Sequence, residues 1–254
     1  MARVVKHQKQ AGENHEENRV SRYHDPRFWH RRYHTKRSRK VMDTLRQPLN
    51  RESCFLDAGT GTGDYLSACS PHVGRAVGID NSLSDLRDAR SLLAGKADVA
   101  QASIADLPFR GSSFDLILCT EVLEHVEDFD GALSELFRVG RETIIVTMPC
   151  VSGLRRFFSG SARRLFRINL RERDQSVGHI NVWGFDQLVG KFKSYGWTVE
   201  ARTWYISCEP MATYPIPSVF SPCVSLFETL FNALFPRAGN HAFLVCRKSQ
   251  KEFH

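Results

Sequence analysis

The sequence predicts an α/β domain in which helices cover both faces of a mostly parallel β-sheet. Two patterns support this fold: short apolar runs alternate with helical stretches, and a glycine-rich loop directly follows the first run. A chain of 254 residues is long enough for one such domain with insertions. Strands are expected in residues 54–59, 75–80, 97–102, 114–120, 143–149, 197–206 and 241–248, and helices near 63–71, 82–93 and 129–138.

Positive charge is concentrated in two segments of the chain. The net charge is +7, yet residues 1–40 contain 12 Lys or Arg against 4 Asp or Glu, and residues 155–173 contain seven Arg against one Glu. Such segments attract phosphate-bearing partners, either nucleic acid or an anionic membrane surface. The alternative is that they are simply solvated, and the polar residues 1–20 are expected to form a disordered tail.

The cysteines and the apolar runs indicate a compartment. The seven cysteines are scattered and include no C-x-x-C pair, which argues against a disulfide framework or a cysteine zinc site and favours a reducing environment. No run approaches the roughly 20 apolar residues that a membrane span requires, and no secretory signal is visible. We therefore expect a cytoplasmic protein.

The glycine-rich segment FLDAGTGTGDYL, residues 55–66, predicts the ligand. The dinucleotide pattern G-x-G-x-x-G fails, because its third glycine position falls on Asp64 or Leu66, and the phosphate-binding pattern G-x-x-x-x-G-K-[ST] is absent. Asp57 before the loop suits a ligand that carries positive charge and no phosphate. Asp80, 23 residues further on, lies where a ribose diol is bound. A nucleoside with a cationic tail describes S-adenosylmethionine.

Five blocks of the sequence resemble class I S-adenosylmethionine-dependent methyltransferases, in particular the broad group with a type 11 domain that includes quinone-biosynthesis and other small-molecule enzymes. They are FLDAGTGTGDYL, AVGIDNSLSDLRDAR, ASIADLPFRGSSFDLILCTEVLEHVED, ETIIVTMP and GHINVWGFDQLVGKFKSYGWTV. The resemblance covers roughly residues 50–205, and the last strand fits as well. It implies a Rossmann-like, seven-stranded, mostly parallel sheet with an antiparallel last strand.

The resemblance also divides the chain into parts. Residues 1–20 would be the tail, residues 21–50 a helical lid, and residues 51–254 the methyltransferase domain. That domain would carry insertions near residues 151–178 and 209–238.

The resemblance further implies which residues bind the cofactor. Around the methionine part it places Asp57, Ala58, Gly59, Thr60 and Gly61; it assigns the ribose to Asp80, the adenine to Asn81, Ser103 and Ile104, and the sulfonium to Thr120. Ser103 replaces the aspartate that the family usually has there, although a serine can still accept a hydrogen bond. The alternatives are a helix cap for Asp57, a turn residue for Asp80 and an ordinary strand end for Ser103.

The stretch TEVLEHVED suggests a catalytic group. On a helical turn Glu121, Glu124 and His125 would share one face, and this E-x-x-E-H pattern resembles that of certain metal-dependent members, although we expect no metal. His125 is the first candidate for a general base. His179 is the second, since the family places its connection over the active site. Structural roles are the alternative for all four residues.

The acceptor is predicted less sharply than the donor. The resemblance places its site between the N-terminal segment, with Trp29 and Tyr33, and the insertions, which include the Arg-rich residues 153–173 and an apolar helix face at 223–235. That face either packs on the sheet or meets a membrane or a greasy substrate. We expect a small-molecule or lipid-like acceptor at an anionic membrane surface. RNA ribose or protein methylation and a non-catalytic scaffold are the alternatives.

Overall fold

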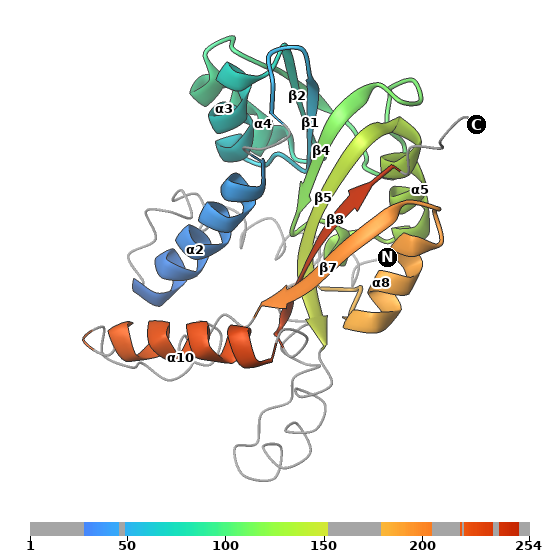
Figure 1. The fold of residues 1–254 in the computed structure, drawn as a ribbon. Coiled ribbons are helices and arrows are strands. Elements are labelled where there is room, and N and C mark those ends of the chain that lie inside the picture. Colours follow the sequence, from blue (N-terminus) through green and yellow to red (C-terminus); the bar gives the residue numbers. More distant parts are fainter. Residues whose placement is uncertain are drawn as a thin grey trace, which may run out of the picture.

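The computed structural model describes residues 28–45, 49–151, 179–204, 219, 221–235 and 239–248. The expected tail at 1–20, nearly all of the expected insertion at 151–178 and the flanking parts of the expected insertion at 209–238 lie outside these residues, as do the side chains of residues 28–33. Figure 1 shows a twisted sheet with helices on both faces and α10 extending below it.

The sheet has the order β3-β2-β1-β4-β5-β8-β7. Strands β1 to β5 pair in parallel, and β8 is antiparallel to both β5 and β7. The seven predicted strands and the antiparallel last strand are confirmed. A further two-residue strand, β6, pairs in parallel with the end of β5 and was not predicted. The strands are β1 (Cys54–Ala58), β2 (Arg75–Asp80), β3 (Asp98–Gln101), β4 (Phe114–Thr120), β5 (Gly140–Val151), β6 (Trp183–Gly184), β7 (Thr198–Trp204) and β8 (His241–Arg247).

Two hydrophobic clusters cover the two faces of the sheet. Helices α2, α3 and α4 contribute to one cluster, and α5 and α8 contribute to the other. The helices are α2 (Phe28–Leu45), α3 (Asp64–Cys69), α4 (Leu83–Leu93), α5 (Phe129–Val139), α8 (Phe185–Lys193) and α10 (Ser221–Leu234), with short 3₁₀ turns η1 (Ser70–His72) and η2 (Leu123–His125).

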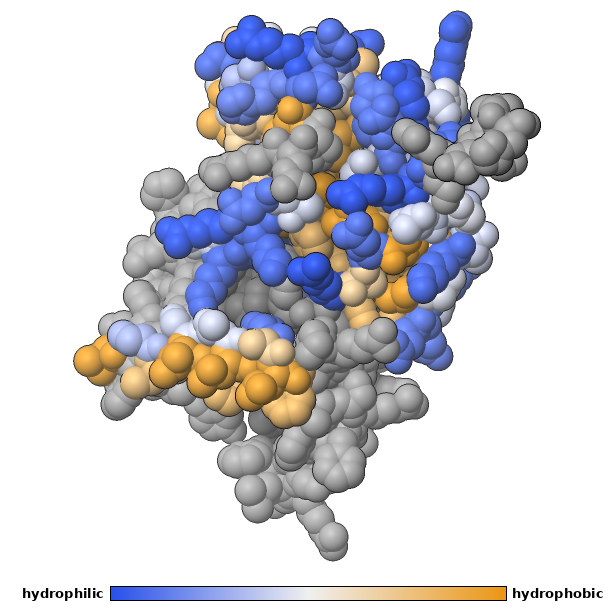
Figure 2. Space-filling view, viewed as in Figure 1, coloured by the Kyte–Doolittle hydropathy of each residue, from blue (hydrophilic) through white to orange (hydrophobic). Residues whose placement is uncertain are grey.

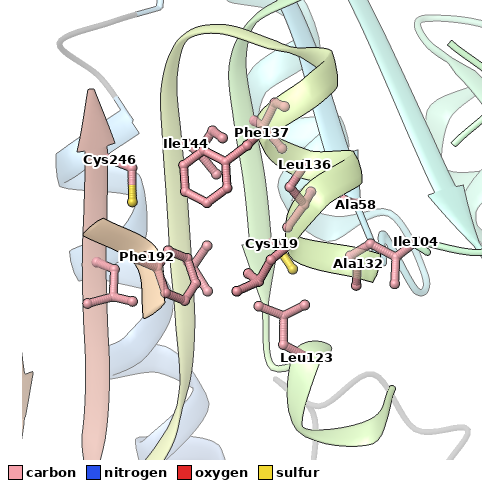
Figure 3. Packing of buried hydrophobic residues seen from close by; sticks show 14 of the residues in the cluster. Ala58, Ile104, Cys119, Leu123, Ala132, Leu136, Phe137, Ile144, Phe192 and Cys246 are labelled. Carbon is pink, nitrogen blue, oxygen red and sulfur yellow. The ribbon is translucent and has the colours of Figure 1, made fainter. Parts of the chain in front are cut away.

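The central strands divide their side chains between these clusters by alternation. In β4, Leu116 and Leu118 face the α2–α4 side, whereas Ile117 and Cys119 face α5 and α8. Figure 3 shows Cys119 among the side chains that α5 and α8 contribute. Because both faces of a parallel sheet are buried, these strands read as continuous apolar runs in the sequence.

The order of the strands reverses between β1 and β4. Ligands of open α/β sheets bind at such a switch point, outside the carboxyl ends of the strands. The turns that follow β1, β2 and β4 meet there, and they contain the loop after Ala58, the loop after Asp80 and the turn after Thr120. The fold therefore brings together three segments that are separated in the sequence.

Candidate active site

The loop between β1 and α3 turns on three glycines in the left-handed region. Gly59, Gly61 and Gly63 have φ values of 82°, 52° and 86°, which residues with a Cβ rarely adopt. A Cβ on Gly59 would lie 2.2 Å from Cγ2 of Val122, so the loop packs directly on the turn after β4. A Cβ on Gly61 would meet nothing within 4 Å. Gly61 therefore borders open space, where a ligand can approach the backbone.

Asp57 lies beneath this loop. Its side chain is buried, and Oδ2 accepts a hydrogen bond of 2.8 Å from the Thr60 hydroxyl. The pKa of Asp57 is raised to about 7, chiefly by burial and to a smaller extent by the nearby Asp80 carboxylate, although the Thr60 hydrogen bond acts in the opposite direction. The Asp57 carboxyl thus supports the loop through Thr60. Its ionisation would respond to the charge of a ligand bound over the loop.

Asp80 connects the loops after β1 and β2. Its Oδ2 accepts a hydrogen bond of 2.8 Å from the Gly61 amide, and its Oδ1 accepts one of 2.8 Å from the Ser82 amide. The side chain remains partly exposed. Each carboxylate oxygen has a second lone pair, so both can accept hydrogen bonds from a diol while the backbone holds them in place.

The three residues expected near an adenine lie in different environments. Asn81 is exposed, and its carbonyl accepts a hydrogen bond of 2.9 Å from the Gln101 side chain. Ser103 is exposed, and its hydroxyl accepts a hydrogen bond of 3.2 Å from the Ala105 amide. Ile104 is buried in the core. Of these three residues, Asn81 and Ser103 therefore present polar side chains to solvent.

Glu121 does not share a helical face with Glu124 and His125, so that expectation was wrong. Its φ of 54° breaks any helical course after Thr120, and its carboxylate turns toward α2 instead. There Oε2 lies 3.1 Å from Nη1 of Arg37, and Oε1 accepts a hydrogen bond of 3.1 Å from the Thr147 hydroxyl. Glu121 is thus part of a buried ionic cluster.

His125 meets His179 instead. The ring centroids of these two histidines are 5.0 Å apart with an interplanar angle of 66°. The preceding residue, Glu124, is buried, and one of its oxygens lies 4.0 Å from Nε2 of His125. The structure therefore brings both predicted base candidates together, beside the turn that contacts Gly59.

The profile of the family described as a methyltransferase domain matches residues 56–144, which span β1 to β5 and every turn described above. Residues 56–144 form a methyltransferase domain.

Relatives of this methyltransferase domain support the assignment. The demethylmenaquinone methyltransferase of Roseiflexus castenholzii is 40% identical over 89 residues, which cover 34% of this chain and 37% of that protein. The protein ECU09_1500 of Encephalitozoon cuniculi, described as a methyltransferase, is 28% identical over 169 residues, or 63% of this chain and 75% of that protein.

A solved structure shares the fold of the methyltransferase domain. Phosphoethanolamine N-methyltransferase 2 of Haemonchus contortus, in complex with phosphomonomethylethanolamine and S-adenosylhomocysteine, superposes with a TM-score of 0.60. The match covers 84% of this chain and 53% of that one at 16% identity, so the likeness concerns the fold alone.

Two residues near the turn after β4 were not predicted from the sequence. Arg37 and His241 both approach Glu121, with His241 Nε2 3.8 Å from Oε2 of Glu121. Arg37 is one of many basic residues in the N-terminal segment, so nothing in its local sequence distinguishes it. The predicted substrate residues Trp29 and Tyr33 fall in the first turns of α2, and their side chains lie outside the described part of the chain.

Proposed function

We propose that the protein is an S-adenosylmethionine-dependent methyltransferase. The observation that carries the proposal is the pair of hydrogen bonds that fixes the Asp80 carboxylate between Gly61 and Ser82. This arrangement presents an anchored carboxylate beside a glycine loop with open space in front of it. A ribose diol fits such a carboxylate, and a cationic group fits a loop that carries no basic side chain.

The residues present fit this donor. Gly61 leaves space for close approach to the backbone, Asp80 would hold the ribose, and Asn81 and Ser103 are exposed at the adenine side. Asp57 would balance positive charge on the methionine part, because its buried carboxyl ionises more readily beside a cation. Ala58, Gly59 and Thr60 would form the backbone wall of this pocket, and Thr120 would face the sulfonium.

The donor supplies a methyl group on a sulfonium that leaves as a neutral thioether. The protein has to align the acceptor, exclude water and, for a hydroxyl acceptor, handle a proton. His125 and His179 are the groups that we assign to the acceptor, because they adjoin the turn that follows Thr120. Which atom of the acceptor is methylated depends on a substrate yet to be identified.

Calorimetric titration with S-adenosylhomocysteine tests the proposal. We expect one site per chain, and at least a tenfold loss of affinity in Asp80→Ala. The control is Asp98→Ala, because Asp98 is an exposed acid whose partner Arg75 is also exposed. If the wild-type protein gives no binding heat, or if the two variants bind equally well, the proposal is wrong and a non-catalytic scaffold replaces it.

We further propose a lipid-like acceptor that is met at an anionic membrane surface. The observation that favours it is the outer face of α10, where the apolar side chains are 48–69% exposed. Figure 2 shows them as a continuous hydrophobic row along the helix. They are Leu226, Phe227, Leu230, Leu234 and Phe235.

The opposite side of α10 is anchored to the rest of the protein. Glu228 is buried and forms an ion pair with Lys36 of α2. This ion pair attaches α10 to α2, so that the apolar row on the other side of the helix points outward. An interfacial helix presents its apolar face in the same way. No helix in the described part of the chain is long and apolar enough to cross a membrane.

Flotation with phosphatidylglycerol vesicles tests this second proposal. We expect binding at low salt, and loss of binding in Leu226→Glu combined with Leu230→Glu. The control combines Ser91→Glu with Leu92→Glu on α4, where two exposed residues receive the same added charge. Equal flotation of both variants would contradict the proposal. Retention of RNA rather than vesicles at low salt would favour the nucleic-acid alternative.

A further inference from the structure

Three side chains with metal-binding atoms converge beside the turn after β4. Glu124, His125 and His179 each offer one ligating atom, and these atoms all lie within 4.8 Å of one another. The carboxylate comes from a buried residue, whereas His125 is partly open to solvent. The set thus combines an oxygen ligand on a buried side chain with two imidazoles that are at least partly exposed.

The backbone holds the two contributing segments together. The amides of Ile180 and Asn181 both donate to the Glu124 carbonyl, at 2.8 Å and 3.1 Å. The Asn181 side-chain amide also donates to the carbonyls of Leu123 and Val126, at 3.0 Å and 2.6 Å. His179, directly before this segment, is therefore kept against η2 by four hydrogen bonds that involve no candidate ligand atom.

We propose that Glu124, His125 and His179 bind one first-row divalent cation. Two imidazoles and one carboxylate are a ligand set that suits such cations and leaves coordination positions open. Atoms bound to one tetrahedral Zn²⁺ lie about 3.3–3.5 Å apart. The three ligating atoms lie within 4.8 Å of one another, so binding would draw them closer together.

Glu121 takes no part in this ligand set. Its carboxylate is held by Arg37 and Thr147, on the side of the turn that faces α2. The cation inferred here therefore has three protein ligands, one of which lies 54 and 55 residues from the other two along the chain. Only the folded protein assembles them.

A cation at this site would bind the methyl acceptor directly, and this part of the inference rests on the proposed function. The three ligands adjoin the turn whose Val122 packs on Gly59, so a bound cation would be close to the donor loop. Its open positions would take an oxygen of the acceptor, such as a hydroxyl or a phosphate, and lower the pKa of a bound hydroxyl. In that arrangement the imidazoles act through the cation, and neither serves as a free base.

Titration of the purified full chain with Co²⁺, followed by visible absorption, tests the inference. We expect one bound ion per chain with the spectrum of nitrogen and oxygen ligands. His179→Gln and His125→Gln should each lower the affinity at least tenfold. The control is His72→Gln, since His72 is an exposed histidine of η1 on a different loop. That variant should bind Co²⁺ as the wild type does.

Two results would overturn the inference. The first is equal Co²⁺ affinity in all three variants, and the second is a thiolate charge-transfer band, which would move the ion to the cysteines. Titration with S-adenosylhomocysteine on the same samples keeps the two proposals separate. Both histidine variants should bind it within about twofold of wild type, so loss of the cation alone leaves the donor site intact.

Discussion

The guanidinium of Arg37 lies 3.1 Å from the carboxylate of Glu121, and both side chains are almost completely buried, at 7% and 11% exposure. The pair connects α2 to the turn after β4, 84 residues further along the chain. Through Glu121 it also stabilises a backbone conformation with positive φ, one residue after Thr120. The N-terminal helix is therefore anchored to the candidate active site by charge as well as by its apolar residues Val41 and Leu45.

Removal of one member of this pair should be costly. We expect Arg37→Met to lower the free energy of unfolding by about 3–5 kcal/mol, because it leaves the Glu121 charge buried without its partner. Arg37→Met combined with Glu121→Gln should recover a large part of that loss. Urea denaturation measures both. A double variant as unstable as the single one would show that the ion pair has no stabilising role.

The two glycines at the start of the loop should respond differently to alanine. Gly59→Ala should lower the melting temperature strongly, because its Cβ would overlap Val122 at 2.2 Å. Gly61→Ala should cost only about 1–2 kcal/mol of backbone strain, since it has a positive φ and free space.

The free space at Gly61 also yields a binding prediction. Gly61→Arg should fold nearly as well as Gly61→Ala but lose affinity for S-adenosylhomocysteine by calorimetry. The long side chain would occupy the open region in front of the loop. If the folded Gly61→Arg variant keeps its affinity for S-adenosylhomocysteine, the donor does not bind at this loop.

The carboxyl of Asp57 should make stability depend on pH. Its pKa is about 7 in the folded state, against a reference value of 3.8, because of burial. The folded protein therefore binds more protons than the unfolded chain between these values, and stability falls as pH rises from about 4 to about 7. The full effect is on the order of 4 kcal/mol.

Asp57→Asn tests that dependence. The amide cannot ionise, so the variant should gain stability relative to wild type as the pH of a urea denaturation series rises from 4 to 8. Asp64→Asn is a matched control, because Asp64 is the first residue of α3, directly after the same loop. Parallel pH profiles for wild type and Asp57→Asn would mean that the buried carboxyl keeps an ordinary pKa.

Asn181 should position the segment that contains His179. Asn181→Ala removes two hydrogen bonds to the carbonyls of Leu123 and Val126, which should lower stability by about 1–3 kcal/mol. It should also weaken Co²⁺ binding while leaving affinity for S-adenosylhomocysteine within about twofold. Unchanged Co²⁺ affinity at reduced stability would limit Asn181 to a structural role.

Much of the fold and the position of the glycine-rich loop could be predicted from the sequence, because both depend on local patterns. Continuous apolar runs mark strands that are buried on both faces, and the spacing between the loop glycines and Asp80 reflects one β–α–β unit. The spacing of apolar residues along α10 is equally a local pattern, so the apolar face of this helix was correctly predicted. Whether that face is covered depends on the packing of distant elements, and the structure leaves it exposed.

What the sequence by itself determined is therefore the succession of strands and helices along the chain and the tight glycine-rich turn after the first strand. Tertiary structure alone decided the partners of the polar residues after β4. Glu121 turns to Arg37 and His125 meets His179, although an E-x-x-E-H pattern suggests a single helical face. The reason is physical: a charged side chain is directed by whichever buried partner satisfies it, and such partners come from distant segments that only the folded sheet brings together.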